Sequence, residues 1–329
     1  AEEVEIETVA VSGTVAVTGN TIAVQTLDPQ GDATLDVAAS SQVEVDGALG
    51  VDAGETLNVT GGGTMAINSS NADLDETATL AVADSTLTLG NATATGNAQV
   101  TLANATVQAA ANGVAIRQAN VSGNVEFAGS AVAVGTLDTS GGAASLTTGN
   151  AGVEVETLSG ANNVTVAQGS VTLTGDSEAF GQTLDVSDGA AVEIEEDAVL
   201  GGSVTLAGAG TINGTVMGAV TVNDADASLG GSGDFQGGLT ITNGVLAPGQ
   251  SPGEITVSGG DFVLGAGATL SVEVDEEGNH DSIRITDDSN ANFVTGAKVV
   301  AVAVGDALDG TYDIATLEGA GHIQVDGAN

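Results

Sequence analysis

The residues of this chain that could do chemistry are mostly carboxylates, because 44 Asp and Glu stand against 3 Lys and Arg and 2 His. One histidine lies in the run Asn279-His280-Asp281-Ser282, which contains the three side-chain types of a nucleophilic triad. A working triad needs a nucleophile, a base and an orienting group that converge from separate elements of the fold. Because these residues are consecutive, we interpret the run as a turn.

A second nucleophile candidate is Gly175-Asp176-Ser177, which resembles the nucleophile block of secreted esterases, some of which are autotransporters. The match covers only these residues, in a chain that is rich in Gly, Asp and Ser. Neither His280 nor His322 accompanies it. We therefore do not expect esterase activity.

Adjacent carboxylates occur at Asp287-Asp288 and at Glu195-Glu196-Asp197. Some β-helical enzymes cleave acidic polysaccharides with paired Asp residues as acid and base, or with clustered Asp and Ca²⁺. Binding a polyanionic sugar requires basic residues, and the 3 in this chain cannot line a groove. A polysaccharide-acting enzyme is therefore the weakest of the functions that we consider, and we predict that the protein is not an enzyme.

Two loop-like acidic clusters could bind a cation: Asp224 with Asp226, and Asp275 with Glu276 and Glu277. Ca²⁺ prefers several carboxylate and carbonyl oxygens. Neither cluster has the EF-hand spacing or the Gly-Asp-rich nonapeptide repeat. A solvated loop is the simpler interpretation of both, so Ca²⁺ is a candidate ligand and no cofactor is predicted with certainty.

The elements that must position these residues are short strands. Runs of alternating apolar and polar residues recur along the chain, as in the unit Thr-Leu-x-Val at residues 34–37, 56–59, 183–186 and 269–272. Alternation indicates strands with one buried face, and a spacing of about 20 residues in places indicates stacked coils. Few aromatics, at 2%, and a uniform composition favour a narrow solenoid. We predict an all-β protein, a single elongated β-helix over residues 1–329.

One strand departs from this pattern. Residues 299–304 are unbroken and apolar, which predicts a strand buried on both faces.

The run Asn243-Gly244-Val245-Leu246-Ala247-Pro248-Gly249-Gln250-Ser251-Pro252-Gly253 resembles the "NGxLxPGxSPG" repeat of autotransporter passenger domains. Asp281-Ser282-Ile283-Arg284-Ile285 resembles the "DxLxV" strand of that family. The resemblance covers residues 230–321. It implies a bacterial right-handed parallel β-helix that is secreted across the outer membrane and lies at the cell surface or outside the cell.

The net charge of −41 restricts the partners of the protein. Nucleic acid binding needs basic patches, and anionic lipid headgroups repel an acidic surface. No run reaches the roughly 18 apolar residues of a membrane helix, so we expect no membrane insertion of this chain. Self-repulsion among the carboxylates is screened by salt, and cations should therefore stabilise the fold.

Each end of a β-helix exposes a coil of unpaired N–H and C=O groups, which is a template for further strand pairing. We predict that Val4, Ile6 and Val9 at one end and Ile323 and Val325 at the other are assembly residues. The expected function is that of a secreted structural subunit, which stacks head to tail into an extracellular filament or matrix. The alternative is a monomeric autotransporter adhesin, which could bind a cell-surface or matrix polysaccharide.

Overall fold

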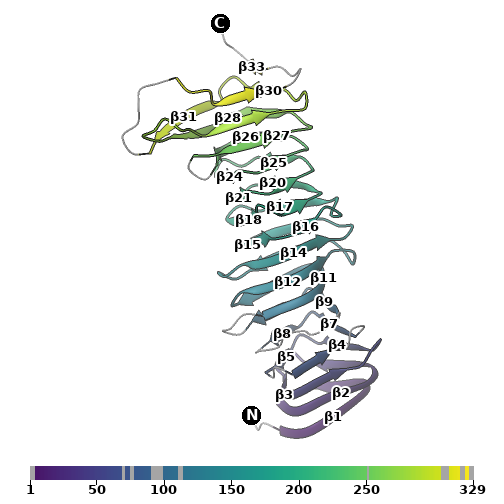
Figure 1. The fold of residues 1–329 in the computed structure, drawn as a ribbon. Helices are drawn as coiled ribbons and strands as arrows, with labels where there is room; N and C mark the ends of the chain where they lie inside the picture. The colour runs from purple at the N-terminus through teal and green to yellow at the C-terminus, as the bar shows by residue number, and fades with distance from the viewer. Residues whose placement is uncertain are drawn as a thin grey trace. The chain divides into compact units, whose positions relative to one another are not determined.

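The computed structural model describes residues 4–68, 71–74, 78–89, 99–109, 114–249, 252–304, 311–318 and 323–325. Within these residues all regular secondary structure is β-strand, and the strands of each ladder are parallel and stacked (Figure 1). The prediction of an all-β parallel β-helix of the right-handed type is therefore confirmed. Contacts divide the chain into two compact units, residues 1–162 and 163–329, which are described separately. That they form one continuous helix stays a prediction.

The strands of the N-terminal unit are β1 (Val4–Val17), β2 (Thr21–Val37), β3 (Gln42–Val51), β4 (Thr56–Thr60), β5 (Thr64–Ile67), β6 (Asn71–Leu74), β7 (Thr79–Ala83), β8 (Thr86–Leu89), β9 (Gln99–Ala103), β10 (Thr106–Ala109), β11 (Val114–Gly129), β12 (Val132–Asp138), β13 (Ala144–Thr148) and β14 (Val153–Ser159). Two inward columns of aligned residues run through them. One column is Val4, Ile22, Val43, Met65, Leu87, Val107 and Phe127. The other is Ala33, Leu57, Leu80, Val100, Ala119, Leu137 and Leu158.

The strands of the C-terminal unit are β15 (Val164–Leu173), β16 (Asp176–Ser177), β17 (Thr183–Val186), β18 (Ala190–Ile194), β19 (Val199–Leu200), β20 (Ser203–Leu206), β21 (Ala209–Ile212), β22 (Thr215–Val216), β23 (Val220–Val222), β24 (Ser228–Gly231), β25 (Asp234–Phe235), β26 (Leu239–Pro248), β27 (Glu254–Val257), β28 (Phe262–Val274), β29 (Ser282–Ile285), β30 (Ala291–Phe293), β31 (Lys298–Ala303), β32 (Ala315–Leu317) and β33 (Ile323–Val325). They form three ladders of parallel strands. The inward columns are Val164-Leu184-Val204-Val220-Leu239-Phe262-Ala291, Val171-Val192-Gly210-Leu229-Leu246-Leu270-Val299 and Ser177-Leu200-Val216-Phe235-Val257-Ile285-Leu317.

The alternation of the sequence explains this core. In the unit Thr183–Val186 the side chains of Leu184 and Val186 are buried, and their polar neighbours are half-exposed. Successive strand residues point to opposite faces, so a period of two places every second side chain inside. Burial of each such leucine contributes about 1.5–3 kcal/mol. The parallel register repeats this inward row from coil to coil, and the core is a stack of aligned side chains that are mostly aliphatic, with Phe127, Phe235 and Phe262 among them.

The passenger-like run forms a corner and a strand of the C-terminal unit. Residues Asn243–Pro248 belong to β26, and Leu246 is fully buried there. Gly244 has φ +93°, and a Cβ at this position would lie 2.6 Å from the carbonyl oxygen of Ala227 in the coil below. Glycine is therefore required at this corner by both the backbone conformation and the spacing of the coils. Gln250 and Ser251 of the run lie outside the described residues.

The prediction that residues 299–304 are buried on both faces is wrong. Val299, Val300, Val302 and Val304 are 49%, 44%, 39% and 41% exposed. β31 pairs with β28 along one edge, and among the described residues no strand pairs with its other edge. Val299, which pairs with buried Leu270, belongs to the inward row of β31, and no described coil covers it. Apolar content alone could not show this.

Candidate functional site

The N-terminal edge, which we define as the edge of β1 that does not face β2, is open. β1 pairs with β2 from Val4–Ile22 to Val17–Val37, and no other strand of the described residues pairs with it. Val4 and Ile6 belong to the inward row, yet they are 45% and 37% exposed. Val45, which aligns with Ile6 two coils further along the stack, is fully buried. Val9 is half-buried. These three predicted assembly residues therefore lie together on an unpaired strand.

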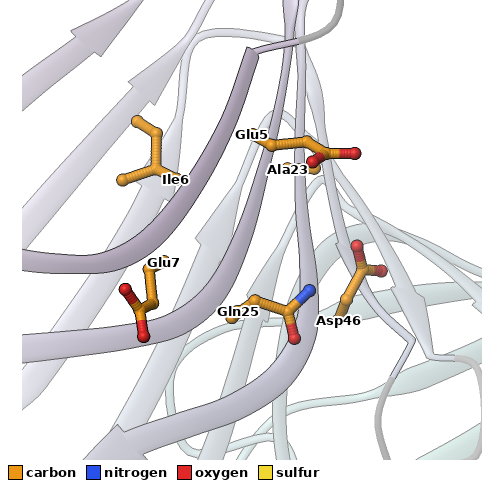
Figure 2. A pocket seen from close by; sticks show the side chains of 6 residues that line it. All are labelled: Glu5, Ile6, Glu7, Ala23, Gln25 and Asp46. Carbon is orange, nitrogen blue, oxygen red and sulfur yellow. The ribbon is translucent and has the colours of Figure 1, made fainter.

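A hollow of about 300 Å³ lies beside this edge (Figure 2). It is lined by Glu5, Ile6 and Glu7 of β1, by Ala23 and Gln25 of β2, and by Asp46 of β3. One oxygen of Asp46 already accepts a hydrogen bond from the Asn68 side chain at 2.9 Å. The carboxylates that line the hollow therefore make the outward side of the N-terminal edge acidic. The inward row of the same edge is apolar.

The C-terminal edges, which we define as the unpaired edges of β31, β32 and β33, end the three ladders of the C-terminal unit. β31 pairs with β28, β32 with β29 and β33 with β30, and no further described strand covers any of them. Ile323 and Val325 pair with Ala291 and Phe293, so these predicted assembly residues lie on a last rung.

Sequence reasoning missed β31 as an open edge. The only signal in the sequence was its place after the last Thr-Leu-x-Val unit, at residues 269–272.

The predicted cation clusters are turns that bind their own backbone. Asp224 accepts a hydrogen bond from the backbone N–H of Asp226 at 3.0 Å. Asp275 accepts hydrogen bonds from the backbone N–H groups of Glu277 and Asn279, and from the Asn279 side-chain amide at 2.7 Å. These bonds, led by the one from the Asn279 side chain, lower the pKa of Asp275. Glu276 and Glu277 are exposed in the same turn.

No group of three or more His, Asp or Glu side chains within the described ranges is arranged to hold a metal ion. The carboxylates of Asp224 and Asp275 instead close turns, a common role for Asp. Calcium binding therefore stays a prediction, and it has no preformed set of side-chain ligands in this part of the chain.

The three side chains of the triad-like run point to separate partners. The His280 ring lies 3.4 Å from the carbonyl oxygen of Gly278 and 3.2 Å from that of Asp313. The Ser282 hydroxyl donates to Glu254 at 3.2 Å. The Asp281 carboxylate is 1% exposed and accepts backbone N–H bonds from Gly253 and Glu273, each at 2.8 Å. The turn lies just before this run, at residues 276–278. His280 forms an isolated antiparallel bridge with Val274, and Ser282 is the first residue of β29, so the prediction that residues 279–282 are themselves a turn is wrong.

Asp281 is the buried anchor of the passenger-like region. Its two oxygens connect Gly253, at the end of the "NGxLxPGxSPG" run, to Glu273 near the end of β28. Burial raises the pKa of Asp281, while the hydrogen bonds from Glu273 and Gly253 act in the opposite direction. The two sequence blocks that carry the family resemblance are thus joined through one carboxylate.

The remaining candidate catalytic residues lie either in the core or in turns. Ser177 lies on the inward row of β16 and is 1% exposed, so it does not line the hollow beside Asp176 and Glu178. Asp287 and Asp288 have φ of +54° and +59° in the turn after β29. Glu195-Glu196-Asp197 is an exposed turn between β18 and β19, closed by a bond from Ala198 N–H to the Glu195 carbonyl.

The part of the chain that the structure describes contains no helix of the length and hydropathy needed to span a membrane. No family model matches the sequence, and a search of curated proteins finds no match. The passenger resemblance consequently depends on the sequence blocks quoted above and on the parallel β-helical fold.

Proposed function

We propose that this protein is an extracellular structural subunit, of the kind found in autotransporter passengers, that assembles head to tail into filaments or matrix. The observation that carries the proposal is the pair of open ends: the N-terminal edge with exposed Val4 and Ile6, and the C-terminal edges with exposed Val299. Water-exposed inward rows and unpaired backbone groups favour addition of another coil. A β1 strand from a second copy supplies such a coil.

The energetics favour assembly only when several contacts form together. Each new backbone hydrogen bond contributes about 0.5–1.5 kcal/mol, and full burial of a valine or isoleucine contributes about 1.5–3 kcal/mol. The net charge of −41 opposes the approach of two copies. Salt shortens the range of that repulsion to about 3 Å at molar strength, so assembly should increase with ionic strength. A heterologous contact between different ends does not close, and it yields fibres.

The test is sedimentation velocity of the purified protein at low salt, at high salt and with added CaCl₂, together with negative-stain images. We expect large species and filaments at high salt or with calcium. The substitution Ile6→Asp places a charge on the inward row of the N-terminal edge and should return the protein to a monomer. Met217→Asp is the matched control, because Met217 is a similarly exposed apolar residue, at 40%, that lies on neither edge.

A protein that stays monomeric in all three conditions would refute the filament proposal and favour the monomeric adhesin. A polysaccharide-acting enzyme is the remaining alternative, and it would release reducing ends or unsaturated products from acidic polysaccharides. Equal loss of assembly in Ile6→Asp and Met217→Asp would show that the N-terminal edge is not the contact.

A further inference from the structure

One of the few cations of the protein lies on a C-terminal edge. The 3 basic residues are Arg117, Arg284 and Lys298, so the C-terminal unit holds two of them. Lys298 is the first residue of β31 and is exposed. It pairs in register with Thr269 while Val299 pairs with buried Leu270, so Lys298 belongs to the outward row and Val299 to the inward row.

Lys298 is also available to a partner. Arg284 is engaged with Glu318, to which its guanidinium donates two hydrogen bonds of 3.2 and 3.1 Å. No carboxylate within the described residues forms such a pair with the Lys298 ammonium. An unpaired cation on an open strand, in a protein with 44 acidic residues, is a feature that general solubility does not require.

The N-terminal edge carries the opposite charge in the corresponding row. Glu5 pairs in register with Ala23, and Ile6 pairs with buried Val24, so Glu5 is in the outward row and Ile6 in the inward row. Glu7 is exposed as well, and both glutamates line the hollow of Figure 2. β1 contains no Lys or Arg.

We propose that Lys298 selects the N-terminal edge of a second copy, so that β1 of one protein pairs with β31 of another. This inference depends on the proposed head-to-tail assembly and names its contact. When the inward rows are aligned, Ile6 and Val299 share the core of the joint, and Lys298 shares the outward row with Glu5 and Glu7. Opposite charges on neighbouring strands favour pairing, and like charges oppose it. A β1–β1 contact would bring glutamates together, which disfavours head-to-head association.

The test measures association of the full chain by sedimentation in low and high salt. Lys298→Glu should weaken association about tenfold or more at low salt, because it places a carboxylate against Glu5 and Glu7. Arg117→Glu is the matched control: it makes the same change in net charge, on the exposed row of β11 in the N-terminal unit. It should associate like the unmodified protein. Lys298→Gln removes only the attraction and should have a smaller effect.

Charge reversal on both sides gives a readout that a folding defect would not produce. Glu5→Lys with Glu7→Lys, mixed with the Lys298→Glu protein, should restore mixed assembly. The difference between Lys298→Glu and Arg117→Glu should shrink at molar salt. If the unmodified protein assembles and the two variants behave alike, Lys298 does not select the edge, while the proposed function stands. If the unmodified protein does not assemble, both proposals fail.

Discussion

The buried carboxylate of Asp281 allows a stability prediction that can be calculated from two hydrogen bonds. The side chain is 1% exposed, and its oxygens accept the backbone N–H groups of Gly253 and Glu273 at 2.8 Å each. In Asp281→Asn one of the two acceptors becomes an NH₂ donor that faces a backbone donor. In Asp281→Ala both acceptors are lost. The two substitutions therefore remove one and two bonds from the same site.

The expected losses follow from the cost of these bonds. A hydrogen bond to a charged group contributes about 1.5–3 kcal/mol, and a buried donor left without a partner costs about 1–3 kcal/mol. Removing the carboxylate also removes the cost of its burial, which offsets part of the loss. We expect the free energy of unfolding to fall by about 1–3 kcal/mol in Asp281→Asn and by about 2–4 kcal/mol in Asp281→Ala.

The pH dependence has a definite sign. Burial raises the pKa of Asp281 above the ordinary value of 3.8. A raised pKa means that the folded state favours the protonated carboxyl of Asp281. The stabilisation of the folded state by this proton is fully present below pH 3.8, and it is lost as the pH rises through the folded-state pKa. The difference in stability between the unmodified protein and Asp281→Asn should therefore be larger near pH 3 than near pH 7.

Urea unfolding followed by circular dichroism measures these differences. Asp197→Asn is the control, because Asp197 is exposed in the turn between β18 and β19 of the same unit. Its stability should differ from that of the unmodified protein by less than about 0.5 kcal/mol. An Asp281→Asn protein as stable as Asp197→Asn, or a difference that grows with pH, would refute the reasoning on Asp281.

Two further outcomes test the fold and its charge. Leu246→Ala truncates a fully buried side chain of β26 and should lower the free energy of unfolding by about 2–5 kcal/mol, whereas Thr242→Ala on the exposed side of the same strand should have little effect. The melting temperature should rise with NaCl because screening relieves repulsion among 44 carboxylates, and a CaCl₂ effect at far lower concentration would indicate specific sites. An unchanged melting temperature in both salts would contradict the prediction that cations stabilise the fold.

Local pattern was sufficient to predict the strands and their inward faces. The units at residues 183–186 and 269–272 are strands with Leu184, Val186, Leu270 and Val272 buried, as their alternation indicated. Alternation determines these features because side-chain direction along a strand depends only on the backbone period.

The same pattern could not show where a ladder ends. Residues 299–304 are as apolar as a doubly buried strand, yet they lie on an open edge, because exposure depends on whether another coil follows. Alternation within one strand shows which side chains point inward, and it does not show whether another coil follows that strand.

The sequence by itself determined the all-β coil, the inward and outward rows, and the acidity from which we expect no nucleic acid partner. The tertiary structure decided which of the many carboxylates is buried and which strands stay unpaired. Asp281 lies 28 residues from Gly253 and 8 from Glu273, and only the stacking of coils brings all three together. Lys298 likewise became notable only because β31 is the last rung of its ladder among the described strands. Both features depend on contacts between distant segments, which a pattern of neighbouring residues does not encode.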